Sequence, residues 1–285
     1  MTQASFDDVG LSCMEIWGGT EAAHNAVSTP GLDFYVHAQP HMGDRAGGDI
    51  HFVSVCGVGR TVRAMLADVS GHGEAASASA SQLRGLMRKS MNTFDQTKMA
   101  RRLNTQFASQ QTSGRFATAL LVTYFGPTGT LILCNAGHPR PLHFDSRHGE
   151  WSLLEGNEEW GESLKGQLRN LPLGVIDGTE YAQRYIQLGE GDLVVMYTDA
   201  LTEARDGSGR MLGEGGLLDA ARTLDIEQDT SDVLGSLMGR IDEHRAGDAD
   251  DDQTVMVLKR NGAKAKMSLG ERARVLSRMM GLAKV

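Results

Sequence analysis

The sequence has little cysteine, little proline and no long apolar run. Its three cysteines, Cys13, Cys56 and Cys134, form no CxxC pair, which argues against a disulfide framework and against a thiolate metal site. Only 6 prolines and 40% hydrophobic residues are typical of a globular protein rather than a disordered one. No apolar segment is long enough to span a membrane, and the N-terminus lacks the basic-then-apolar order of a signal peptide. We therefore expect a cytoplasmic protein with one large domain.

Charge is unevenly distributed along the chain. A net charge of −8 disfavours general binding of nucleic acid. The segment from Lys259 to Val285 holds eight basic residues and one acidic residue, a net charge of +7, so the remainder carries −15. Within it, Ser268-Leu269-Gly270-Glu271 has the form of a capping box and predicts a basic amphipathic helix. Such a tail, residues 261–285, would dock on an acidic partner, on an anionic membrane surface or on its own acidic domain.

Aspartates stand at the ends of four strand-like segments that lie far apart in the sequence. They are Asp49 in Gly47-Gly48-Asp49, Asp68 in Asp68-Val69-Ser70-Gly71-His72-Gly73, Asp199 after the apolar run 193–197, and Asp251 and Asp252 before Val255. Carboxylates that cluster raise one another's pKa, so proteins normally keep them together only where cations neutralise them. Oxygen ligands alone indicate Mg²⁺, Mn²⁺ or Ca²⁺ rather than zinc. The pattern predicts a metal site built from several strand ends.

Hydrophobic periodicity predicts alternating blocks of strands and helices. Strands are expected at residues 32–38, 50–58, 61–67, 119–125, 130–135, 191–199 and 255–258, and helices at 74–92, 95–111, 215–224 and 231–245. Turns between the strands favour antiparallel hairpins, so the predicted fold class is α+β, a sandwich of mainly antiparallel sheets with helices. Residues 1–32 are expected to form an ordered arm in which Ile16 and Trp17 cover the domain edge. The polar segment 155–170 is a candidate flap or partner surface.

Six short motifs follow one another along the chain. They are GGD (47–49), DVSGHG (68–73), NAGHPRP (135–141), LPLG (171–174), YTDALTEA (197–204) and DDQT (251–254). With these motifs, residues 33–260 resemble the metal-dependent protein phosphatases, the PPM or type 2C family, and within it the bacterial SpoIIE/RsbU-like branch. The resemblance implies an α/β/β/α sandwich of two mainly antiparallel sheets flanked by helices, with metals at one edge.

The resemblance also implies a site for two ions, Mn²⁺ or Mg²⁺. Asp68 would bridge the two ions and, together with Asp199, carry catalysis. The candidate metal ligands are these two aspartates, the Val69 carbonyl, Asp49, which would bind directly or through water, and Asp251, with Asp252 as an additional candidate. The acidic run 248–252 leaves the register of the last ligand open between Asp251 and Asp252.

Three basic residues near the motifs have less defined roles. Eukaryotic relatives place a proposed general-acid histidine two residues after the bridging aspartate, whereas this chain has Ser70 there and His72 two positions later. His72 is therefore a candidate acid or a structural residue. Arg45 stands near the place of a phosphate-binding arginine in some relatives, and the alternative is an exposed loop charge. His138, in NAGHPRP, is typical of a turn held by hydrogen bonds.

The resemblance implies a metal-dependent phosphoserine/phosphothreonine protein phosphatase in bacterial signalling, in which a metal-activated water attacks the phosphoryl group. By resemblance, a phosphorylated STAS-domain anti-anti-sigma factor in a partner-switching circuit is a candidate substrate. The short N-terminal segment leaves no room for a sensor domain ahead of the phosphatase region, so we expect either a separate activator protein or constitutive activity. No cysteine lies in a Cys-x5-Arg loop, which disfavours a cysteine-dependent phosphatase. The alternative function is a catalytically silent protein-binding module of the same family.

Overall fold

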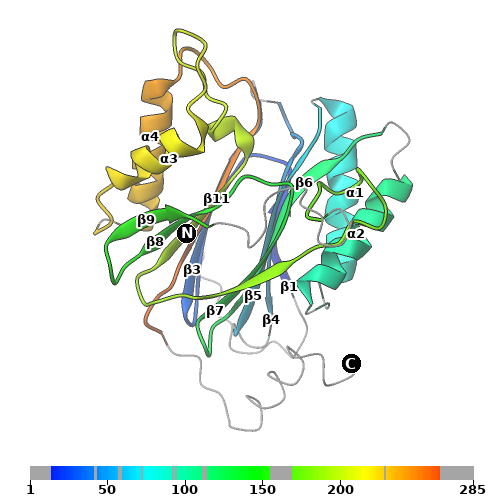
Figure 1. Ribbon diagram of the computed structural model, residues 1–285, viewed down its shortest axis with the longest axis horizontal. Helices are drawn as coiled ribbons and strands as arrows, with labels where there is room; N and C mark the ends of the chain where they lie inside the picture. Colours follow the sequence, from blue (N-terminus) through cyan, green and yellow to red (C-terminus); the bar gives the residue numbers. More distant parts are fainter. Residues whose placement is uncertain are drawn as a thin grey trace.

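The computed structural model describes residues 14–41, 44–56, 60–71, 73–91, 93, 95–110, 114–154, 169–227 and 229–263. These residues form two six-stranded antiparallel sheets that lie face to face, with a pair of helices on the outer side of each sheet (Figure 1). The four layers confirm the predicted α/β/β/α sandwich. None of the helices in the described ranges is both long enough and apolar enough to cross a membrane.

Each sheet is assembled from segments that are far apart in the chain. In spatial order the first sheet contains β1 (Met14–Gly19), β4 (Asp49–Cys56), β5 (Thr61–Val69), β6 (Ala117–Phe125), β7 (Thr130–Ala136) and β10 (Gln183–Gln187). The second sheet contains β2 (Ala23–Thr29), β3 (Leu32–Gln39), β12 (Gln253–Lys259), β11 (Leu193–Tyr197), β8 (Leu142–Asp145) and β9 (Glu150–Leu153). β12, the last strand of the described chain, lies between β3 and β11, so the second sheet pairs strands from near both ends of the described chain.

Alternation along the strands supplies an apolar surface to both faces of each sheet. The first sheet is covered by α1 (Glu74–Ser90) and α2 (Gln96–Gln110), and the second by α3 (Gly213–Arg222) and α4 (Thr230–His244) (Figure 1). In β5, Met65 packs with the residues of α1 and α2, whereas its neighbour Leu66 packs between the sheets. In β11, Met196 faces the first sheet and Val195 faces α3 and α4. Since successive side chains of a strand point to opposite faces, both sheets need a layer on each side.

Each predicted helix and strand has a counterpart in the structure, which also contains strands for which we predict no bounds, near the N-terminus and within residues 140–190. All four predicted helices are confirmed, with ends that differ by at most two residues. The prediction that strands begin at Leu32 is wrong, because β1 and β2 precede it. β2 is largely exposed and therefore shows no apolar alternation. The segment expected to be an arm instead supplies one edge strand to each sheet, and Trp17 contacts Phe34 with ring centroids 6.4 Å apart. Residues 155–168 of the predicted flap and 264–285 of the predicted tail lie outside the described residues.

Candidate metal centre

The acidic strand ends come from both sheets and meet at one edge of the sandwich. In the first sheet, Asp49 at the start of β4 is paired in register with Asp68 near the end of β5. In the second sheet, Asp199 follows β11 and opens a short 3-10 helix. A hydrogen bond of 2.9 Å from Thr198 Oγ1 to Asp49 Oδ2 joins the two sheets at this edge. The fold therefore brings together carboxylates that are up to about two hundred residues apart in the sequence.

Asp49 is a buried carboxylate, with 6% of its surface exposed. Thr198 Oγ1 donates to it and in turn accepts a 3.0 Å hydrogen bond from the backbone N–H of Thr254. Burial and the neighbouring charge of Asp68 raise the pKa of Asp49 well above its ordinary value. The threonine hydroxyl thus orients a carboxylate whose charge is costly in the absence of a cation.

Asp68 and Asp199 are surrounded by negative charge. Burial, followed by the charges of Asp199 and Asp251, raises the pKa of Asp68 to about 7. Burial, followed by the charges of Glu203 and Asp251, raises the pKa of Asp199 to about 6. Among the described residues, no lysine or arginine forms an ion pair with any of these carboxylates. A cation that neutralised the cluster would remove this repulsion.

The two neighbouring aspartates before β12 have different surroundings. Asp252 is buried, and its carboxylate accepts hydrogen bonds from the backbone N–H groups of His41, at 2.7 Å, and Gly48, at 2.6 Å. Both of its oxygens are therefore used within the protein. Asp251 is exposed, and its charge acts on Asp68 and Asp199. Asp252 thus anchors the backbone at His41 and Gly48, whereas Asp251 stays the candidate ligand.

Both glycines of the GGD motif allow the backbone before β4 to lie close to Asp252 and Val69. A side chain at Gly47 would overlap the carboxylate of Asp252. A Cβ atom at Gly48 would stand 2.9 Å from the carbonyl oxygen of Val69, closer than carbon and oxygen atoms normally approach. The backbone N–H of Val69 also donates to the carbonyl of Gly48 at 3.2 Å. The loop before β4 thus packs directly on the carbonyl that the sequence predicts as a ligand.

The side chains at this edge fit a hard cation that keeps part of its water shell. The donors are carboxylate and carbonyl oxygens, the ligands that Mg²⁺ and Mn²⁺ prefer. A small cavity of about 10 Å³, roughly the size of one water, is bounded by Asp49, Asp252 and Thr254. In the part of the chain that the structure describes, no three His, Cys, Asp or Glu side chains enclose an ion by themselves. Mg²⁺ is commonly held by one or two carboxylates with water as the remaining ligands, so the donor set suits it.

The basic residues of the sequence prediction have separate outcomes. His72 lies outside the described residues, so its role stays a prediction. Arg45 is an exposed loop residue. His138 is buried, with its Nδ1 2.9 Å from Thr118 Oγ1, and burial lowers its pKa to about 3. Asn135 accepts from the backbone N–H of His138 and donates to its carbonyl, both at 2.8 Å. His138 is therefore a neutral residue that holds a turn.

Sequence reasoning did not single out Glu203 and Arg115. Glu203 stands four residues after Asp199, and its N–H donates to the Asp199 carbonyl at 2.8 Å, so one helical turn brings the two acids together. Arg115 precedes β6, and its Nε lies 3.9 Å from the point where a side chain at Gly71 would begin. The spacing D-x3-E was a signal for Glu203. No local motif indicates that Arg115 lies near Gly71, because the two come together only when β5 pairs with β6.

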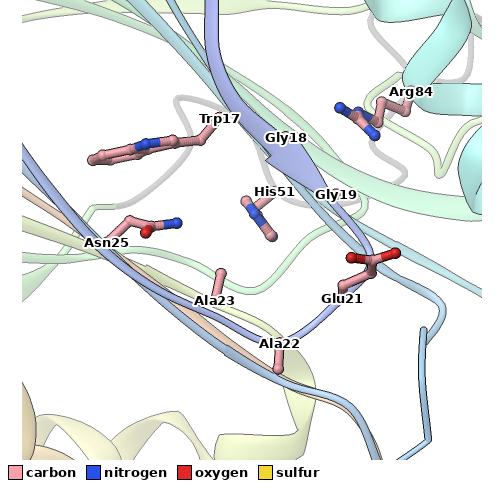
Figure 2. Close-up of a pocket in the computed structure, with 9 residues that line it drawn as sticks. All are labelled: Trp17, Gly18, Gly19, Glu21, Ala22, Ala23, Asn25, His51 and Arg84. Atoms are coloured by element: carbon pink, nitrogen blue, oxygen red, sulfur yellow. The ribbon is translucent and has the colours of Figure 1, made fainter. Parts of the chain in front are cut away.

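A larger cavity lies beside the carboxylate cluster rather than within it. It has a volume of about 430 Å³ and is bounded by β1, β2, β4 and α1 (Figure 2). Trp17, His51 and Arg84 are among its lining side chains. Glu21 borders this cavity and the small cavity next to Asp49. The edge strands β1 and β2 therefore shape the surface that adjoins the carboxylate cluster.

Comparison with known proteins places the fold. The family model of stage II sporulation protein E (SpoIIE) matches residues 59–261. The RsbU and RsbW domains of Rv1364c from Mycobacterium tuberculosis have a TM-score of 0.70 at 22% sequence identity, over 92% of this chain and 71% of that one. The PP2C phosphatase domain of SpoIIE from Bacillus subtilis, with a fragment of its regulatory domain, has a TM-score of 0.66 at 18% identity, over 82% of this chain and 65% of that one. RsbX in complex with magnesium has a TM-score of 0.59 at 14% identity, over 84% of this chain and all of that one. No curated protein sequence matches this chain.

The family match covers most of the sandwich and most of the candidate site. Residues 59–261 include Asp68, Asp199 and Asp251, whereas Asp49 and the first strands precede the match. The solved structures share the two antiparallel sheets and their flanking helices with this protein. The chain therefore belongs to the SpoIIE family and has the fold of the PP2C phosphatases.

Proposed function

We propose that this protein is a metal-dependent phosphoserine/phosphothreonine protein phosphatase. The observation that carries the proposal is the cluster of Asp49, Asp68 and Asp199, which two sheets bring together with no basic ion-pair partner in the described chain. Without a bound cation, the repulsion among these carboxylates would only destabilise the folded protein. The arrangement is explained if the cluster holds Mn²⁺ or Mg²⁺, the ions that its oxygen donors suit.

The residues of the chain would act by holding the ions that activate the attacking water, and the chain supplies no cysteine nucleophile at Cys134. Asp68, Asp199 and Asp251 would hold the ions together with Asp49 and the Val69 carbonyl. When bound, the ions would polarise the phosphoryl oxygens and lower the pKa of an attacking water. Thr198 keeps the Asp49 carboxylate oriented toward the cluster. Cys134 is buried, and burial raises the pKa of its thiol to about 12, so it is no nucleophile.

The substrate we propose is a phosphorylated protein, and a STAS-domain anti-anti-sigma factor is the leading candidate. Support comes from membership of the SpoIIE family and from similarity to a structure in which an RsbU domain accompanies an RsbW domain. Similarity to a protein of the bacterial stressosome also fits a partner-switching circuit. A separate activator protein belongs to the same proposal.

The proposal is tested by phosphate release from p-nitrophenyl phosphate and from a phosphoserine protein, with Mn²⁺ and with EDTA. Asp199→Ala should lower the rate at least about 100-fold, since it removes a ligand of the metal that activates the water. The matched control is Asp219→Ala, which removes an exposed aspartate on α3 and should leave the rate unchanged. Metal binding is measured in parallel by calorimetry.

Two results would change the conclusion. If the wild type binds no Mn²⁺ or Mg²⁺, the carboxylate cluster is not a metal site and the phosphatase proposal fails. If the wild type binds metal but hydrolyses neither substrate, even with candidate activators added, the protein is a silent binding module of the family.

A further inference from the structure

Three large apolar side chains are exposed on two backbone segments that lie next to each other and close to Asp68. Phe116, Val175 and Ile176 are 40%, 46% and 43% exposed, and they are three of five large apolar side chains exposed in the described chain. We call these three residues the apolar ledge. Isolated apolar residues on a surface are ordinary, but adjacent ones commonly mark a binding site.

Backbone pairing places the ledge beside Asp68. Ala117 and Leu173 exchange two backbone hydrogen bonds, of 2.8 and 2.7 Å, so Phe116 lies next to the loop that carries Val175 and Ile176. On its other side, Phe116 exchanges hydrogen bonds with Ser70, through the Ser70 N–H at 2.9 Å and the Ser70 Oγ at 3.1 Å. Asp68 lies two residues before Ser70, a distance of about 7 Å along a strand.

The loop is held rigidly in its exposed position. The buried side chain of Asn104 in α2 accepts from the N–H of Gly174 at 2.7 Å and donates to the carbonyl of Ile176 at 2.9 Å. Gly174 has a φ of +88°, and a side chain there would press on Phe107. A buried amide thus uses both its ends to present two apolar side chains to solvent. Packing of the core alone does not require this arrangement.

We infer that the apolar ledge binds apolar side chains that flank the phosphorylated residue of a protein substrate. The inference rests on the proposed phosphatase function and adds a specificity to it. A phosphoserine at the metal edge would place residues one to three positions away over the ledge, because an extended chain advances about 3.4 Å per residue. Arg115 Nε lies 3.9 Å from the position that a Cβ atom at Gly71 would take, in the turn that follows Asp68.

The test compares two peptides that differ only in their flanks. Both carry a non-hydrolysable phosphonate analogue of phosphoserine and a fluorophore, and one has leucine where the other has serine at the two positions on each side. Binding is measured by fluorescence anisotropy with Mn²⁺ present. The wild type should bind the leucine peptide about tenfold more tightly, the effect of burying about one apolar side chain. In Phe116→Ser/Val175→Ser/Ile176→Ser this preference should vanish.

The controls separate the ledge from general surface hydrophobicity and from catalysis. Tyr185→Ser removes a 54% exposed aromatic from β10, an edge strand of the first sheet, and should keep the tenfold preference. Val175→Ser alone should reduce the preference about threefold, which serves if the triple variant unfolds. Wild-type turnover of p-nitrophenyl phosphate reports on the phosphatase proposal independently of peptide binding. An equal affinity for both peptides in the wild type, or a tenfold preference that survives in the folded variants, would overturn the inference. So would a wild-type dimer that the ledge substitutions dissociate, because the ledge would then bind a second copy.

Discussion

At the scale of single residues, the same substitution should have different effects at the adjacent positions Asp251 and Asp252, on metal binding at the first and on stability at the second. Asp252→Asn places an amide N–H₂ against one of the two backbone N–H donors, while its carbonyl oxygen accepts from the other, and should lower the free energy of unfolding by about 1–3 kcal/mol. Asp251→Asn, at an exposed position, should change it by no more than about 0.5 kcal/mol. The Asp251 variant should instead weaken Mn²⁺ binding about tenfold or more. Urea unfolding in EDTA and calorimetric titration measure the two effects, and a stable Asp252→Asn protein would contradict this assignment.

The glycine that contacts Asp252 gives a second residue-level prediction. Gly47→Ala inserts a methyl group where the Asp252 carboxylate lies and should cost about 1–3 kcal/mol of unfolding free energy through overpacking. Gly85→Ala is the matched control, because nothing lies within 4 Å of a methyl group at this position in α1. It should stabilise the protein by about 0.5–1 kcal/mol, since alanine is the better helix former. Both are measured by urea unfolding in EDTA, and equal effects would exclude close packing as the cause.

His138 makes the stability of the protein depend on pH. Its pKa falls from an ordinary 6.5 to about 3 in the folded protein, so below pH 6.5 the unfolded chain takes up a proton that the folded protein does not. Stability that is fully present above pH 6.5 is therefore lost as the pH falls. Relative to His138→Gln, the wild type should lose about 2 kcal/mol between pH 7 and pH 5. Unfolding of both proteins at the two pH values tests this, and parallel curves would show that the buried imidazole takes up its proton without penalty.

At the scale of elements, Trp17 should stabilise the packing of the two sheets against each other. It lies in β1 of the first sheet, contacts Phe34 in β3 of the second, and packs against the core between them. Trp17→Ala should lower the free energy of unfolding by about 2 kcal/mol, less than the 3–5 kcal/mol typical of a fully buried aromatic. Tyr185→Ala removes an exposed aromatic from another edge strand and should cost about 0.5 kcal/mol or less. If Trp17→Ala and Tyr185→Ala lower the free energy of unfolding equally in thermal or urea unfolding, Trp17 does not help to hold the two sheets together.

Elements with strong periodicity could be predicted from the sequence, and those formed by pairing alone could not. α1 and α2 are visible because residues such as Leu83 and Met87 recur at helical spacing. β2 could not be found, since as a mostly exposed edge strand it is held by hydrogen bonds to β3 rather than by an apolar face. The same limit applies to the site. Its aspartates stand in local motifs, whereas the contact of Arg115 with the Gly71 turn exists only after β5 and β6 pair.

At the scale of the whole molecule, the carboxylate cluster should lower stability whenever no metal is bound. The pKa of Asp68 rises from 3.8 to about 7 on folding, so its charge destabilises the folded protein above pH 7 and has no such effect below about pH 4. In EDTA at pH 8, Asp68→Asn should raise the free energy of unfolding by about 2–4 kcal/mol. The gain should shrink at pH 5, and Mn²⁺ should no longer stabilise the variant. Urea unfolding with and without Mn²⁺ tests this, and a variant less stable than the wild type in EDTA at pH 8 would contradict it.

The central place of β12 has a consequence for how the protein is made. During translation, β3 and β11 leave the ribosome before the strand that belongs between them, so each keeps an unpaired edge until residues 253–259 have been synthesised. Asp251 and Asp252 arrive with that same segment. A nascent chain therefore cannot assemble the full carboxylate set before almost all of the sandwich exists. A messenger cut short ahead of this strand would yield a polypeptide that lacks part of the carboxylate set and is prone to aggregate.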